Sequence, residues 1–369
     1  MTLVLMAIAN EKQPSKHKLI IINRYPMNYV KHSYLLFLLT ALPSVSQAVV
    51  DEPLEEQATE KSVKQPVKQA PEQSKFNISS NTFLEIEEFK GYKINDKKVF
   101  DKISPVVQVA IQPVDSKWSY FMEYKVSMRN YTTNFHSEKT SYNRNRLQLQ
   151  VNRNLYKSQD ANLNLSFVYR KESNDVKSGM PAKNSYHSYW LIPGGSYNFT
   201  EKFAFAFWDA AYYYDNAFSG PGYNDWEWES EHGFQYRIND KVLAKLMYYT
   251  DWTWNSHGDK TWEQNQIRGY FPTTINEQWN IQPYFRYFLN EKNYDPLTGA
   301  TTNRADNGGL RLGLIVNYNL TPKTTLWTNL AWEQTTWQHS KNSQQVHLTY
   351  GDDNTQDFRL YSIGIRHIW

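Results

Sequence analysis

Residues 361–369 at the end of the chain read Tyr-Ser-Ile-Gly-Ile-Arg-His-Ile-Trp, and this stretch is the most informative sign of the fold. Its side chains alternate, so that Tyr361, Ile363, Ile365 and Trp369 share one face of a strand, and Ser362, Gly364 and Arg366 the other. A soluble sheet seldom ends on a bare Trp with nothing to cover it. The last strand of a transmembrane β-barrel does, because it faces lipid and closes against the first strand.

The composition fits the same class of fold. The 369 residues include 27 Tyr, 13 Trp and 18 Phe, yet the mean hydropathy is −0.71. Such a polar but aromatic-rich chain is expected where each strand has one apolar and one wet face and aromatic girdles mark both membrane interfaces. The chain has no cysteine, which excludes thiol catalysis and cysteine metal sites and suits a periplasmic or outer-membrane protein built without disulfides.

The first 48 residues have the order of a secretory signal. Lys31 and His32 precede an apolar run at 34–42, and Ser46-Gln47-Ala48 suits cleavage after Ala48. We predict a signal peptide within residues 1–48, with Met27 as a plausible true start; the alternative is a short N-terminal membrane anchor. Without this leader the chain has 35 basic and 36 acidic residues, so the apparent basicity does not argue for nucleic acid as a partner.

The rest of the chain divides into a tail and a barrel. Residues 49–75 hold three prolines, many charges and no aromatics, a composition that predicts a disordered periplasmic tail; a solvated spacer or a contact with peptidoglycan or a partner are its possible roles. From Phe76 to Trp369 tight turns alternate with longer polar connections. We predict an all-β, 14-stranded antiparallel transmembrane β-barrel at 76–369, with strands at 76–92, 103–112, 117–132, 142–156, 161–173, 185–199, 203–216, 225–238, 242–254, 260–272, 278–290, 307–319, 324–338 and 355–369.

Alternation also assigns the two faces of each strand. In 142–156, for example, Leu147 and Leu149 face lipid, whereas Gln148 faces inward. In 203–216 both parities are aromatic, so the pattern does not assign its faces. The inward charges are predicted to line the pore, although they also suit structural ion pairs, and we expect both roles. They are Arg144, Arg146, Arg170, Arg268, Arg286, Arg311, Arg366, Glu85, Glu87, Glu123, Glu227, Glu229, Glu231 and Glu333.

Several segments, in matching order and spacing, resemble the OmpG-like family of monomeric outer-membrane porins. They are Phe76-Asn77-Ile78, Leu84-Glu85-Ile86-Glu87, Glu229-Ser230-Glu231, Gln266-Ile267-Arg268-Gly269-Tyr270-Phe271-Pro272, Arg311-Leu312-Gly313-Leu314 and Ile363-Gly364-Ile365. The resemblance implies a monomeric, water-filled channel for passive uptake of oligosaccharides and other small hydrophilic solutes.

The resemblance also implies a gate. The family's sixth long loop matches residues 291–306, and the gating residues would be Glu291, Asp295, Thr298, Arg304 and Asp306. The family's pH-coupled histidine pair matches Asn307 and Trp337, with His339 two residues on, which departs from the family pattern and puts pH gating in doubt.

Little in the sequence points to catalysis. It has no hydrolase, metalloprotease or P-loop motif, and His136, His187, His257, His339 and His347 are scattered in or beside outer loops. Glu227 and Glu229 would stand roughly 7 Å apart on one strand face, a spacing that suits glycoside hydrolysis, but no cleft other than the pore serves them. We therefore predict no enzyme activity, no catalytic residues, no metal site and no cofactor.

Three alternatives remain open from the sequence. They are a porin specific for acidic oligosaccharides of the oligogalacturonate type, an outer-membrane hydrolase, and a soluble extracellular β-protein. The main prediction places the chain as an integral protein of the bacterial outer membrane. Its partners would be membrane lipid, lipopolysaccharide, the barrel-assembly machinery acting on the strand that ends at Trp369, and small solutes.

Overall fold

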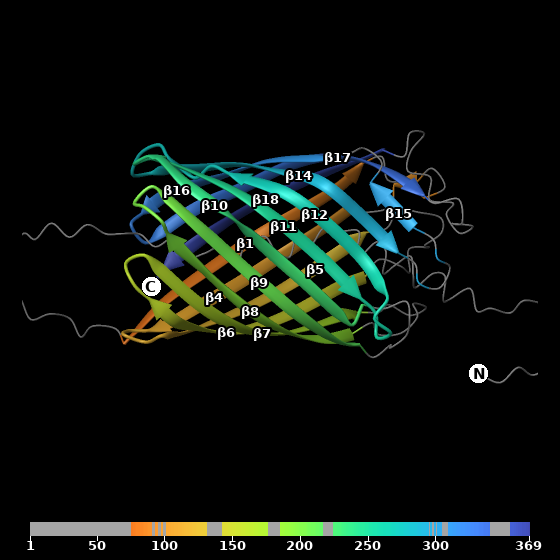
Figure 1. Ribbon diagram of the computed structural model, residues 1–369, viewed down its shortest axis with the longest axis horizontal. Coiled ribbons are helices and arrows are strands. Elements are labelled where there is room, and N and C mark those ends of the chain that lie inside the picture. Colours follow the sequence, from red (N-terminus) through yellow and green to blue (C-terminus); the bar gives the residue numbers. More distant parts are fainter. Residues whose placement is uncertain are drawn as a thin grey trace, which may run out of the picture.

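The structure, a computed structural model, describes residues 75–90, 93–94, 97–98, 101–130, 142–175, 185–216, 224–294, 296, 299, 301–304, 309–339 and 355–369. Fourteen long strands run through them (Figure 1). They are β1 (Phe76–Lys90), β4 (Asp101–Pro113), β5 (Trp118–Asn130), β6 (Tyr142–Lys157), β7 (Ala161–Asp175), β8 (Ser185–Asn198), β9 (Phe203–Asn216), β10 (Trp226–Asn239), β11 (Val242–Trp254), β12 (Lys260–Tyr270), β14 (Trp279–Tyr294), β16 (Leu310–Thr321), β17 (Thr324–His339) and β18 (Thr355–Ile368).

Each long strand pairs antiparallel with the next, and the first pairs with the last. The β1–β18 ladder runs from Ser79 opposite Ile368 to Lys90 opposite Asp357, and the Trp369 amide donates to the Ile78 carbonyl at 3.0 Å. The sheet is therefore a closed barrel without a free edge. Each wall strand has a hydrogen-bonded neighbour on both sides, so its backbone polar groups are paired. The prediction of an all-β, 14-stranded antiparallel barrel is confirmed. Among the described residues, no helix is long and apolar enough to cross a membrane.

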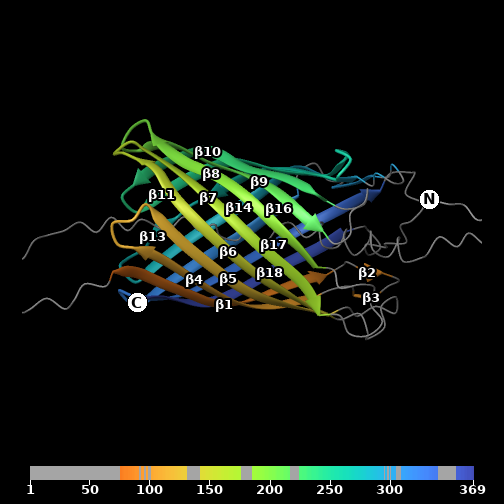
Figure 2. The same cartoon turned by 90° about the horizontal axis from the view of Figure 1, so that it is seen from below.

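The two ends of the barrel differ. Tight turns join the strands at one end, and the short strands β2 (Lys93–Ile94), β3 (Lys97–Lys98) and β15 (Thr301–Arg304) lie at the other (Figures 1 and 2). In outer-membrane barrels the short turns are periplasmic, which makes the second end the outer one. Both Phe76 and Trp369 lie at the periplasmic end.

Three predicted boundaries between residues 270 and 310 are wrong. The strand expected at 260–272 stops at Tyr270 and resumes as β13 (Thr273–Thr274), because Pro272 has no amide proton to give to the ladder. The loop expected at 291–306 is partly strand: β14 continues to Tyr294, and β15 pairs with β14 on one side and β17 on the other. The next strand starts at Leu310 instead of residue 307.

Exposure follows the predicted parity. On β5 the side chains of Trp118, Tyr120, Met122 and Tyr124 are exposed, whereas Lys125 is buried. Successive side chains of a strand thus alternate between an apolar outer surface, which faces lipid, and a polar inner wall. This is the arrangement that a barrel adopts when a lipid-facing charge costs about 2–4 kcal/mol at the membrane midplane.

The structure assigns the faces of β9, which the sequence pattern did not. Phe205 and Phe207 face outward and pack against β10, whereas Trp208 and Tyr212 face inward between small alanines. Hydrophobic side chains of β7, β8 and β9 form a cluster on the inner wall: Val168, Trp190, Ile192, Ala210 and Tyr212, with Trp208 and Tyr214 against them.

One polar pair breaks the apolar outer surface. Asp209 of β9 has the same outward parity as Phe205 and Phe207, and its carboxylate lies 3.0 Å from the His232 ring of β10. Each residue is the seventh of a strand of 14, so the pair stands near mid-height among Phe205, Phe207 and Phe234.

Candidate functional site: the charged inner wall

The structure places all 14 predicted pore-lining residues on the inner parity of the barrel. They occupy β1 (Glu85, Glu87), β5 (Glu123), β6 (Arg144, Arg146), β7 (Arg170), β10 (Glu227, Glu229, Glu231), β12 (Arg268), β14 (Arg286), β16 (Arg311), β17 (Glu333) and β18 (Arg366). Most of them lie in the outer half of the barrel. Arg366 stands apart, opposite Asn81 in the periplasmic half.

Two lysines neutralise the acidic residues of β1. Lys125 of β5 lies 2.7 Å from Glu85, and Lys102 of β4 pairs with Glu87 and lies 3.7 Å from Glu85. All four side chains are buried. This part of the wall is therefore a closed ion-pair network held across three strands, the arrangement that a buried carboxylate needs to remain ionised.

Glu172 of β7 organises the neighbouring arginines. Its carboxylate lies 2.6 Å from Arg144, 2.8 Å from Arg146 and 3.7 Å from Arg170. Arg170 also donates two hydrogen bonds to the Gln148 side chain and stacks 4.0 Å from the Trp190 ring. One acid thus holds three bases in place, two of them in ion pairs of 2.8 Å or less.

Three arginines stand in a row across neighbouring strands in the later half of the chain. Arg268, Arg286 and Arg311 occupy directly paired positions on β12, β14 and β16. The outer two have acidic partners: Arg268 lies 2.8 Å from Glu231, and Arg311 lies 2.6 Å from Glu333. In the part of the chain that the structure describes, Arg286 has no carboxylate partner and its Nε atom has no hydrogen bond.

The expected gate residues fall into two groups. Glu291 lies in β14 and Arg304 in β15, and their side chains are joined by an ion pair that also includes Glu333 at 2.9 Å from Arg304. These two residues are therefore fastened to the wall. Asp295, Thr298, Asp306 and Asn307 lie outside the described residues, and of Trp337 and His339 only the backbone, in β17, is described.

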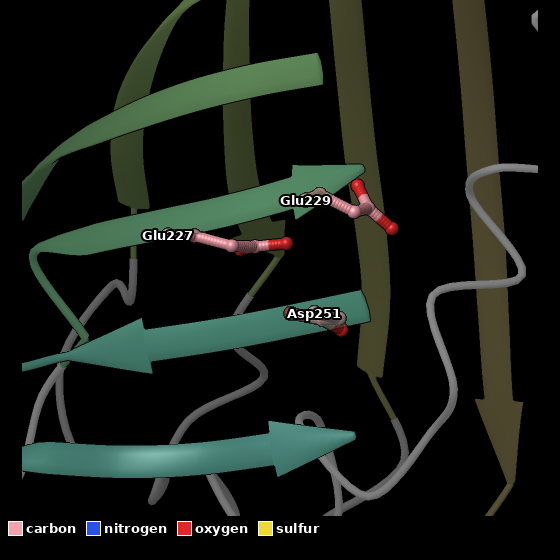
Figure 3. Close-up of side chains that lie close together, drawn as sticks. All are labelled: Glu227, Glu229 and Asp251. Atoms are coloured by element: carbon pink, nitrogen blue, oxygen red, sulfur yellow. The ribbon is translucent and has the colours of Figure 1, made fainter. Parts of the chain in front are cut away.

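Three carboxylates gather near the outer end of β10 and β11. Glu227, Glu229 and Asp251 each place an oxygen within 4.8 Å of the others (Figure 3). At this separation two unit charges repel by roughly 3 kcal/mol at an effective dielectric constant of about 20. Just outside β10, burial raises the pKa of the Asp225 carboxyl, against a backbone hydrogen bond from Ser256 that lowers it.

Sequence reasoning missed three residues of this wall: Lys102, Glu172 and Asp251. Strand parity could have found Glu172 and Asp251. Glu172 has the parity of the predicted Arg170, and Asp251 has that of Tyr249 on the same strand. The prediction of no metal site considered only scattered histidines, and the Glu227–Glu229 spacing was weighed for hydrolysis without an acid from the next strand.

A closed 14-stranded cylinder that is apolar outside and charged inside defines a channel protein of the bacterial outer membrane. Residues 73–355 match the family Outer membrane protein G (OmpG), and the chain belongs to that family. The resemblance predicted from the sequence is thereby confirmed. The family is one of channels rather than enzymes, and its members are integral to the outer membrane.

One curated relative and several solved structures are similar to this chain. Outer membrane porin G of Escherichia coli (strain K12) is 24% identical over 232 residues, which cover 62% of this chain and 74% of that protein. A Pseudomonas aeruginosa FadL homologue has a TM-score of 0.43 at 9% identity, covering 79% of this chain and 90% of its own. The KdgM porin has a TM-score of 0.33 at 8% identity, covering 78% and 98%.

Proposed function

We propose that the barrel is a monomeric, water-filled channel through which small hydrophilic solutes and oligosaccharides diffuse passively. The observation that carries this proposal is the continuous charged and polar inner wall inside a closed apolar cylinder. Eight strands make a barrel that side chains can fill, so 14 leave room for water. The wall charges would then meet solutes that cross the lumen.

Pairing within the wall limits which charges act on a solute. Glu85, Glu172 and Glu333 are each held by bases on neighbouring strands, so their fields are largely cancelled nearby. Among the described residues, Arg286, Glu227 and Asp251 have no ion-pair partner, so their charge remains available to a solute. We therefore propose that these few residues act electrostatically on solutes in the pore. Most of the other inward charges form structural ion pairs.

Conductance of the purified protein in a planar bilayer tests the proposal. We expect stepwise openings whose unit size is that of a single chain, and swelling of protein-containing liposomes in sugar solutions at rates that fall as the sugar becomes larger. Protein folded in detergent, checked by its altered gel migration when unheated, serves as input. A folded protein that neither conducts nor admits sugars would refute the channel.

The arginine row favours a second candidate, a channel that prefers acidic oligosaccharides. Arg268, Arg286 and Arg311 stand side by side, and the middle one has no carboxylate among its described neighbours. Guanidinium groups bind carboxylates through paired hydrogen bonds. Substitution of Arg286 by Gln should lower anion preference in a salt gradient and weaken block by oligogalacturonate, whereas an Arg144→Gln control, which removes a base already paired to Glu172, should change both less.

The regions outside the described residues complete the proposal. Residues 1–48 would be a cleaved secretory signal, with Met27 as the true start, and 49–75 a disordered periplasmic tail. N-terminal sequencing of the mature protein, expected to begin at Val49, tests the first assignment. The barrel-assembly machinery would recognise the strand that ends at Trp369, and cross-linking at low protein density should leave a single-chain band if the channel is monomeric.

A further inference from the structure

The three carboxylates of the outer wall are held close together by neighbouring strands. Glu229 of β10 is directly opposite Asp251 of β11, and Glu227 lies two positions earlier on the same face of β10 (Figure 3). Glu229 and Asp251 are 1% and 6% exposed. The register of a two-strand ladder, and not a flexible loop, therefore fixes the positions of these acids.

Two acids of this cluster, Glu227 and Asp251, lack the bases that neutralise acids elsewhere in the wall. In the described part of the chain, no Lys, Arg or His forms an ion pair with Glu227 or Asp251. The nearest arginines are already engaged, Arg268 with Glu231 and Arg170 with Gln148. Glu172, by contrast, has two arginines within 2.8 Å. The pairing with bases that Glu172 receives is therefore missing at Glu227 and Asp251.

Tyrosines orient the carboxylates without neutralising them. Tyr212 donates to Glu229 at 2.5 Å, Tyr249 donates to the other oxygen of Glu229, and Tyr214 donates to Glu227. A carboxylate has about four lone-pair sites, so each keeps capacity for a further ligand. The three phenol donors fix the directions of two acids in the manner of the outer-shell partners of a metal site.

A second observation points to a ligand. Asp251 is nine-tenths buried, yet its Oδ1 atom has no hydrogen-bond partner among the described residues. A buried carboxylate oxygen is rarely left without a partner, because desolvation is then uncompensated. Asp251 belongs to the same small group of converging carboxylates.

We infer that Glu227, Glu229 and Asp251 bind a divalent cation, with Ca²⁺ as the ion that fits them best. Ca²⁺ takes carboxylate oxygens, singly or in pairs, at about 2.3–2.6 Å, so two of its ligands stand at most about 5 Å apart. The oxygens here lie within 4.8 Å of one another. Mg²⁺ needs oxygens at about 2.0–2.1 Å in a near-ideal octahedron and would require the strands' side chains to move further inward.

The site stands where an external cation can reach it. Glu227 and Asp251 lie one and three residues from the outer ends of β10 and β11, at the level of the exposed Trp226 and Trp228. A bound cation would tie β10 to β11 through the wall and remove most of the negative potential at this part of the mouth. Cation binding would thus couple the ion content of the medium to the selectivity of the channel.

Terbium luminescence tests the inference, since Tb³⁺ occupies Ca²⁺ sites and is excited by nearby tyrosines. Full-length folded protein in detergent, stripped with EDTA, should show saturable Tb³⁺ emission that Ca²⁺ displaces. Asp251→Asn and Glu227→Gln should each lower the apparent affinity for Tb³⁺ by about tenfold or more, and Tyr249→Phe by a similar factor if it acts as an outer-shell partner. The control Glu123→Gln, an inner acid near Arg146, should leave the affinity unchanged.

The outcomes separate the possibilities. Absence of Ca²⁺-displaceable emission from the wild-type protein overturns the inference and means that protons neutralise the acids. Equal affinities of wild type and the Glu227→Gln/Asp251→Asn double variant overturn it too, because emission then comes from other carboxylates. Unheated gel migration shows that each variant has folded. Binding is measured without any conductance, so a failed channel assay and a failed cation site are distinguishable.

Discussion

The pair of Asp209 and His232 on the lipid-facing surface gives the sharpest test of the barrel's energetics. Their side chains lie at mid-height of β9 and β10, 3.0 Å apart, on a face that otherwise presents Phe205, Phe207 and Phe234. The perturbation is to replace each by Leu, singly and together. Leu suits a surface in contact with acyl chains and offers no hydrogen bond.

The expected magnitudes follow from what each change leaves behind. His232→Leu removes a hydrogen bond to a carboxylate, about 1.5–3 kcal/mol, and leaves Asp209 alone against lipid, where a lone acid costs somewhat less than the roughly 2–4 kcal/mol of a lone base. The new Leu side chain offsets part of this, so we expect a net loss of about 2 kcal/mol in the free energy of unfolding. Asp209→Leu leaves only an imidazole and should cost about 1 kcal/mol or less. The double variant should be at least as stable as the wild type.

Equilibrium unfolding by urea in lipid vesicles measures these differences, with the four proteins of the cycle compared at one pH. The coupling energy from the cycle should be about 2–3 kcal/mol. Phe234→Leu, an apolar exchange on the same face of β10, is the matched control for altered lipid contact. If the double variant loses the sum of the two single losses, the pair contributes no mutual stabilisation and the reasoning is refuted.

Three further changes test other parts of the wall. Glu333→Gln should lower the free energy of unfolding by about 3–5 kcal/mol, because it strips the acid shared by the buried Arg304 and Arg311, and urea titration in vesicles would detect it. Gly233→Ala should cost at least about 1–3 kcal/mol and lower folding yield, since its Cβ would meet a backbone oxygen of β11 at 2.1 Å; unheated gel migration reports the folded fraction. Trp369→Ala should lower the amount of barrel in the outer membrane of cells more than it lowers refolding into detergent, and equal losses in both would argue against recognition of the terminal strand.

Much of the fold could be predicted from the sequence because nearly every strand of the barrel follows the same alternation of apolar and polar side chains. A side chain on the wrong parity meets either lipid or water, so alternation, aromatic girdles and turn residues all point to the same strands. The strand at 203–216 resisted this rule because rings suit both faces of a wall: Phe205 meets lipid and Trp208 packs on the inner cluster. The extension of β14 to Tyr294 was missed because its pairing partner, β15, is a strand of four residues inside a polar connection.

The candidate site could be predicted from the sequence only in part, because the sequence gives the face of each side chain but not its partner. Parity states that Arg311 and Glu227 face inward, but not which neighbour each meets, because that depends on register between strands. Register brings Glu333 opposite Arg311 and Asp251 opposite Glu229. A sequence reading therefore predicts which charges line the wall but leaves open which of them are cancelled by a partner.

Register also decides what the wall does to a passing ion. Where β7 presents Glu172 to the arginines of β6, opposite charges meet, and the field they send into the lumen is short-ranged. Where β12, β14 and β16 present arginines at paired positions, and β10 and β11 present acids, like charges meet. Like charges repel, and a counterion from the solution would relieve that repulsion. The counterion would be an anion beside Arg286 and a cation beside Asp251. We therefore expect solutes and ions to be recognised at the positions where like charges of the wall face one another, and strand register determines where those positions are.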